Sequence, residues 1–164
     1  MAYLTYVIEH YSDIPETIVF LHSHHDGYPQ AWHTDADNYD NVASLRTLNI
    51  GFVQRNGYAN LRCIFIPGCP DEIQPFREPW EGHRETEHLM PDVWRYMFGN
   101  VEVPRRIGVA CCSQFAVSRK QVHSRPLADY ERCRQWLLDT ELSDDASGRV
   151  MEYIWHIIFG QEPV

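Results

Sequence analysis

Residues 17–26, TIVFLHSHHD, decide the fold that we expect for this chain. The segment 17–21 is β-branched or apolar throughout, which is typical of a central strand buried on both faces. Three histidines and an aspartate follow at once, so the strand ends in a polar loop. We therefore expect a buried strand whose carboxyl end opens into a functional loop, where open α/β sheets bind their ligands.

Helical and strand patterns alternate along the rest of the chain. Apolar residues at helical spacing predict helices over 3–11, 41–48, 84–98, 126–139 and 143–160, and further strands are predicted over 61–66 and 106–110. This alternation indicates an α/β fold, with a layered Rossmann-like or glycosyltransferase-A-like sheet and flanking helices. Three strands make a thin sheet, so we expect an N-terminally truncated version of a larger one.

Length and composition predict one α/β domain over residues 1–164. The chain has 164 residues, of which 44% are hydrophobic, enough for a packed core. Its apolar runs are too short to cross a membrane and no signal peptide precedes them, so we expect a cytoplasmic protein without a membrane partner.

The chain contains five cysteines, an odd number that includes one adjacent pair. Such a set is a poor disulfide framework, and it predicts free thiols, most of them buried, in a reducing compartment. No C-x-x-C pair is present, so a cysteine zinc site is not expected.

The chain is acidic as a whole, but one segment of it is basic. The net charge is −9, yet the segment 104–134 carries seven basic residues against two acidic ones. A basic segment on an acidic protein is suited to a phosphate-bearing partner. The simpler interpretation is a set of solvated helix faces.

Four of the nine histidines lie between residues 22 and 33. His22 and His24 would share one side if the strand continued, and with a carboxylate they could hold a divalent metal. The alternative is that these imidazoles hydrogen-bond the loop backbone. We expect His22, His24 and His33 to shape a substrate pocket without a tightly bound metal or cofactor.

Two further segments could carry chemistry. Cys112 and Gln114 follow the third predicted strand, where many nucleophiles lie, although burial is the commoner fate of such a cysteine. Asp13 and Glu16 lie three residues apart before the first strand. Carboxylates serve as general bases or as guanidinium partners, although acidic turn residues are commonplace.

Several stretches together resemble a fungal domain family that long had no assigned function, and through it the arginine-containing cyclodipeptide synthases of fungi. The resemblance covers nearly the whole chain and rests on residues 3–11, 17–22, 30–35, 60–63, 67–70, 110–119 and 148–156.

The resemblance implies an enzyme of fungal secondary metabolism. Enzymes of this kind condense arginine, taken from aminoacyl-tRNA, with a second amino acid into a diketopiperazine. Their D-D-x-x-E motif matches Ser12, Asp13 and Glu16, with serine in place of the first acid. The match makes Glu16 the expected general base and Asp13 a guanidinium partner or a second base.

The resemblance and the residue patterns together give the remaining expected sites. We expect tRNA, and no DNA, as the nucleic-acid partner, bound by Arg119, Lys120 and Arg125. The expected substrate-binding residues are His22, His24, His33, Trp32, Cys112 and Gln114.

Two other functions are compatible with the sequence. The first is a glycosyltransferase-like enzyme, with His22 and His24 where such folds often place metal ligands. The second is a non-catalytic family member, because longer relatives carry a segment before the first predicted helix.

Overall fold

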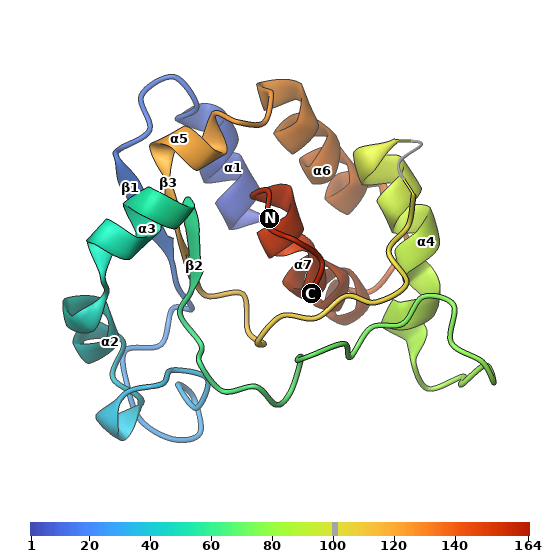
Figure 1. The fold of residues 1–164 in the computed structure, drawn as a ribbon, viewed down its shortest axis with the longest axis horizontal. Helices are drawn as coiled ribbons and strands as arrows, with labels where there is room; N and C mark the ends of the chain where they lie inside the picture. The colour runs from blue at the N-terminus through green and yellow to red at the C-terminus, as the bar shows by residue number, and fades with distance from the viewer. Residues whose placement is uncertain (100–101) are drawn as a thin grey trace.

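The computed structural model describes residues 1–99 and 102–164, in which helices surround one small sheet (Figure 1). The strands are β1 (Thr17–Phe20), β2 (Tyr58–Asn60) and β3 (Phe115–Ser118). The α-helices are α1 (Ala2–Glu9), α2 (Asn41–Thr47), α3 (Ile50–Asn56), α4 (Glu85–Phe98), α5 (Arg119–Val122), α6 (Leu127–Asp139) and α7 (Asp144–Ile158), and one 3-10 turn spans Asp37–Tyr39.

The order of the strands is β1-β3-β2, and both pairs are antiparallel. Phe20 lies opposite Phe115, and Thr17 lies opposite Ser118. The end of β1 therefore lies beside the start of β3, while the start of β1 lies beside α5. This register decides which of the expected site residues meet.

An aromatic cluster joins the sheet to the helices. The ring of Phe115 lies 5.2 Å from Phe20, 5.5 Å from Trp155 and 5.4 Å from Phe159, measured between centroids. Tyr3 of α1 adds a contact to Phe20 at 4.5 Å. Figure 1 shows α1, α4, α6 and α7 to one side of the strands, and α3 contacts all three strands.

Helix α7 forms as its sequence predicts. The side chain of Ser143 accepts a hydrogen bond from the Ala146 amide, which caps the helix, and two aspartates in the first turn favour its dipole. The buried stripe of α7 includes Val150 and Ile154. The predicted strand over 17–21 and the helices over 3–11, 41–48, 84–98 and 126–139 are likewise confirmed, with small shifts at their ends.

Two predicted strands are wrong. Segment 61–66 leaves the sheet because the Asn60 side chain accepts the Arg62 amide and the Asp35 carboxylate accepts the amides of Cys63 and Ile64. Segment 106–110 forms one isolated bridge, between Ile107 and Ile73. The real third strand begins later, at residue 115.

The mixed α/β class is confirmed, whereas the Rossmann-like layering is not. A Rossmann sheet is mostly parallel, and the strands described here pair antiparallel. β1 is an edge strand with alternating burial, and β3 is the buried centre. Over residues 1–99 and 102–164, no helix has the length and apolar character needed to cross a membrane.

Replacing Phe115 tests the aromatic cluster. Phe115 is fully buried, so Phe115→Ala should lower the free energy of unfolding by about 3–5 kcal/mol, measured by chemical denaturation. Phe52→Ala is the control, because Phe52 is 46% exposed and should cost less than about 1 kcal/mol. Equal losses in the two variants would contradict the central role of Phe115.

Candidate functional site

A hollow of about 510 Å³ lies between the loop after β1 and the N-terminal half of α7. We call it the histidine cleft. It is lined by His22, His24, Gln30, Trp32, His33, Pro67, Cys111, Cys112, Asp144, Asp145, Gly148, Arg149 and Glu152. A second hollow, of about 450 Å³, shares His22, Asp144 and Gly148 with it and extends it toward α1.

Gln114 holds the histidine loop against the sheet. Its side chain is 2% exposed and precedes β3 directly. The Oε1 atom accepts the His22 amide at 3.1 Å, and Nε2 donates to the His33 carbonyl at 3.2 Å. Both ends of the amide therefore bond the loop backbone, which makes Gln114 a positioning residue for the cleft.

The three expected histidines do come together. The ring centroids of His22 and His33 lie 4.1 Å apart, and the ring centroids of His24 and His33 lie 5.9 Å apart. Burial lowers the pKa of His33 to about 4, and the nearby His22, His24 and Arg62 act in the same direction. Burial also lowers the pKa of His22 and outweighs the opposing Glu152 charge. Both shifts favour the uncharged form of the ring.

One atom of this cluster has no partner among the described residues. His33 is 4% exposed, and its Nε2 is buried without a hydrogen bond. Buried polar atoms are nearly always satisfied, so an unpaired ring nitrogen beside a cleft indicates a place for a ligand or a water molecule.

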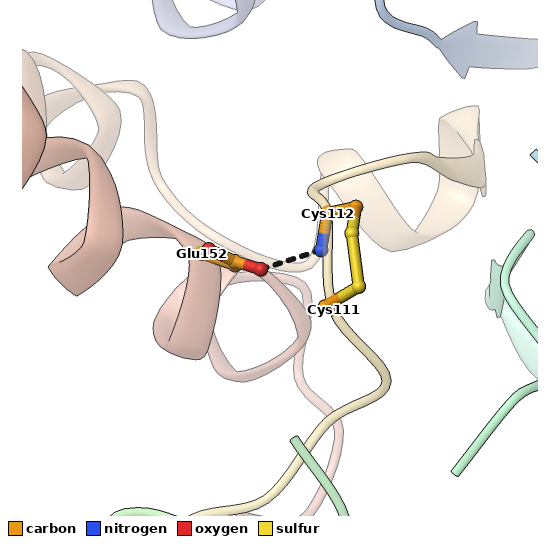
Figure 2. Close-up of side chains that lie close together, drawn as sticks. All are labelled: Cys111, Cys112 and Glu152. Carbon is orange, nitrogen blue, oxygen red and sulfur yellow. Dashed lines mark hydrogen bonds between the residues drawn. A yellow bond between two sulfur atoms is a disulfide. The ribbon is translucent and has the colours of Figure 1, made fainter. Parts of the chain in front are cut away.

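Carboxylates form the opposite wall of the cleft. Asp144 and Asp145 are exposed in the first turn of α7, and Glu152 follows about two turns later. The Glu152 Oε1 atom accepts the Cys112 amide at 2.6 Å (Figure 2), and Oε2 accepts Arg149 at 3.0 Å. The cleft thus pairs imidazoles with a negatively charged wall.

A buried cation lies beneath the rim of the cleft. Arg62 is 6% exposed, and its guanidinium lies 4.8 Å from the centroid of the Trp32 ring. Its Nε lies 3.9 Å from an Asp35 oxygen, and Nη1 lies 4.0 Å from the Cys112 sulfur. Trp32, itself 44% exposed, is therefore held at the rim by a cation–π contact.

Sequence reasoning missed Arg62, Glu152 and the two aspartates of α7 as site residues. An arginine within the apolar run LRCIFIP was the one available signal, since a charge there needs a partner. The acidic start of α7 looked like ordinary helix capping.

The expectation of free thiols is wrong for Cys111 and Cys112, which form a disulfide. A turn with positive φ at Cys112 and Ser113 brings the two sulfurs together. Cys63, Cys69 and Cys133 are free, as expected, although Cys63 is exposed.

The described residues also contain one close grouping of potential metal ligands, made of Cys111, Cys112 and Glu152. Neither His22 nor His24, the pair considered from the sequence as metal ligands, belongs to this grouping.

The acids of the expected motif lie elsewhere. Ser12, Asp13 and Glu16 are exposed, and the Glu16 carbonyl accepts the Arg119 amide at the start of α5. They are therefore at the far end of the sheet, about 13 Å from the histidine end along a four-residue strand. The structure does not bring the predicted acids and the predicted pocket together.

The expected tRNA-binding residues divide into two groups. Arg119 and Lys120 are exposed on α5, at the end of the sheet opposite the cleft. Arg125 is held inside the fold by the Ile158 carbonyl and Asp129. The basic segment is thus partly used by internal contacts, and its tRNA role stays a prediction.

Gln114→Leu tests the positioning of the loop. Leucine keeps the volume but leaves the His22 amide and the His33 carbonyl without their partner. The free energy of unfolding should fall by about 1–3 kcal/mol. Gln135→Leu, on an exposed α6 site, should change it by less than about 0.5 kcal/mol. Hydrogen exchange in residues 22–33 should rise only in the first variant.

His33 should make stability depend on pH. Its pKa is about 4 when folded and about 6.5 when unfolded, so the unfolded chain binds more protons between those values. The contribution of His33 to the free energy of unfolding is fully present above pH 6.5, and it is lost as the pH falls toward 4. His33→Phe should reduce the slope of unfolding free energy against pH by up to about 1.4 kcal/mol per unit.

The control for this measurement is Phe52→Ala, which changes an exposed side chain that does not titrate and should leave the slope unchanged. A slope that His33→Phe does not alter would show that His33 is not buried in the neutral form.

Comparison with known proteins gave one match. No curated protein matches the chain, and no solved structure matches it. The model of a family described as "Protein of unknown function (DUF3431)" matches residues 1–164. This finding overturns the membership that the sequence resemblance implied, because nothing ties the matched family to the arginine-containing cyclodipeptide synthases. The chain belongs to the uncharacterised DUF3431 family.

Proposed function

We propose that this protein is an enzyme that acts on a small cationic substrate, carrying an amine or a guanidinium, in the histidine cleft. The observation that carries the proposal is one hollow lined by imidazoles and by three carboxylates, with Arg149 the one arginine or lysine among its lining residues.

The carboxylate wall would bind the cation. Asp144, Asp145 and Glu152 line the same side, and carboxylates accept charge-assisted hydrogen bonds from ammonium and guanidinium groups. Glu152 is the most enclosed of the three, since its side chain is 12% exposed. Trp32 at the rim offers an aromatic face to the same ligand.

The imidazoles would accept the proton that the bound ammonium loses. His22 is less buried than His33, so it is the better candidate for a general base that takes a proton from a bound ammonium. Loss of that proton turns an amine into a nucleophile, and general-base catalysis of this kind contributes about 10²–10⁴ in rate. His33, held through Gln114, would fix the position of the His22 ring.

Group transfer to an amine is the reaction class that this arrangement suits. The reaction to test first is the condensation of arginine from aminoacyl-tRNA into a diketopiperazine, which is the activity that we expected from the sequence. The acidic cleft supports an arginine-like substrate. In this proposal His22 takes the role that the sequence motif gave to Glu16.

Charge-removing variants test the proposal. Arginine, agmatine and spermidine should bind more tightly than glutamate or glucose, measured by calorimetry. The double variant Asp144→Asn with Asp145→Asn should weaken cation binding about tenfold or more. The matched control is Asp13→Asn with Glu16→Gln, which removes two exposed charges at the far end of the sheet and should leave binding unchanged.

Turnover provides the second measurement. Expression in a host that supplies charged tRNA, with mass spectrometry of the medium, should show arginine diketopiperazines that fall about 10²–10⁴-fold in His22→Gln and persist in His25→Gln. Loss of binding and product in the Asp13/Glu16 variant alone would overturn the proposal and return the chemistry to the sequence motif.

A further inference from the structure

The Cys111–Cys112 pair lies on the wall of the histidine cleft, against a carboxylate from α7 (Figure 2). Both sulfurs and a Glu152 oxygen lie within 4.8 Å of one another. Glu152 is 40 residues away in sequence and is fixed there by the Cys112 amide. Three potential ligands from two segments are therefore already gathered.

We propose that the reduced Cys111–Cys112 pair and Glu152 form a binding site for a thiophilic divalent metal ion such as Zn²⁺ or Cd²⁺. The site exists only when the disulfide is open, because thiolates bind such ions and a disulfide does not. This inference goes beyond the proposed function and does not depend on it.

The redox step balances with a dithiol as reductant. The dithiol gives two electrons and two protons to the Cys111–Cys112 bond and becomes a disulfide itself. The two sulfurs are then thiols. Binding of the metal ion displaces both protons to solvent and forms two metal–sulfur bonds, so metal affinity rises with pH.

Charged groups of both signs surround the two sulfurs. Arg62 Nη1 lies 4.0 Å from the Cys112 sulfur, and Arg62 Nε lies 3.9 Å from an Asp35 oxygen. Two thiolates and a carboxylate carry three negative charges. A divalent ion offsets two of them, and Arg149 pairs with the Glu152 carboxylate at 3.0 Å.

The ligand set leaves one coordination position free. In a tetrahedral zinc site with Zn–S bonds of about 2.3 Å, two sulfurs are about 3.8 Å apart, a separation that neighbouring residues can span. Three protein ligands with an open fourth position are typical of catalytic rather than structural zinc. Because all three ligands line the cleft, the open position would face its interior.

The experiment uses the full chain reduced with a phosphine, which becomes a phosphine oxide and leaves no competing thiol. Co²⁺ is the probe, since thiolate ligation gives a near-ultraviolet charge-transfer band. We expect one equivalent to bind with this band, Zn²⁺ to displace it, and the oxidised protein to show none. Glu152→Gln should lower the Co²⁺ affinity about tenfold, and Cys112→Ser should abolish the band.

Cys63→Ser is the matched control, because Cys63 is exposed, free and outside the grouping, and it should bind as the wild type does. Thiol labelling of the wild type gives a measurement that does not depend on the folding of any variant. Cd²⁺ should protect Cys111 and Cys112, and not Cys63, from alkylation. The proposal fails if the reduced protein binds no metal, if binding survives oxidation, or if protection falls on Cys63.

Discussion

One side-chain amide, that of Gln114, holds the candidate site together. The loop from β1 to α2 contains one 3-10 turn and no other helix or strand. Some of its peptide groups bond within the loop, as Gly27 does to Asn38, and others need partners outside it. Gln114, the residue directly before the central strand β3, supplies two such partners. Its side chain accepts a hydrogen bond from the His22 amide and donates one to the His33 carbonyl. The 4.1 Å separation of the two imidazoles follows from this tie. A cleft formed by an irregular loop is thereby given the rigidity of the sheet.

The antiparallel register then decides what the site can contain. Because Phe20 lies opposite Phe115, the residues after β1 meet the residues before β3, and His22 and Cys112 come to line one cleft. The same register places Glu16 beside Arg119 at the other end. In a parallel sheet the carboxyl ends of β1 and β3 would have met, and the basic residues after β3 would have stood beside the histidines. The direction of one strand therefore separates the two groups that sequence reasoning had combined.

Signals from neighbouring residues in the sequence predicted many of the helices and strands, but they predicted little of how the strands pair. Ser143 before two aspartates marks the start of α7, and the β-branched run at residues 17–20 marks β1, because capping and propensity are properties of neighbouring residues. β3 has the sequence FAVS, in which two of the four side chains are small, so its apolar pattern is weak although all four residues are buried. Segment 106–110 looks more like a strand and is not one. The histidine cluster was visible in the sequence, whereas the contacts of Arg62 and Glu152 depend on tertiary packing.

Glu152 connects the two proposals, since the carboxylate that would bind a metal ion also belongs to the wall that would bind a cationic substrate. Its oxygens already accept the Cys112 amide and Arg149. A metal ion bound to Glu152 would occupy a carboxylate oxygen that could otherwise accept a hydrogen bond from an ammonium or guanidinium group. The same ion would present its open coordination position to neutral or anionic ligands. The oxidised pair, which cannot bind the metal, leaves the Glu152 carboxylate available to the substrate. The cleft is therefore suited to a cationic substrate in the disulfide form, and the state of Cys111–Cys112 would select which class of ligand it accepts.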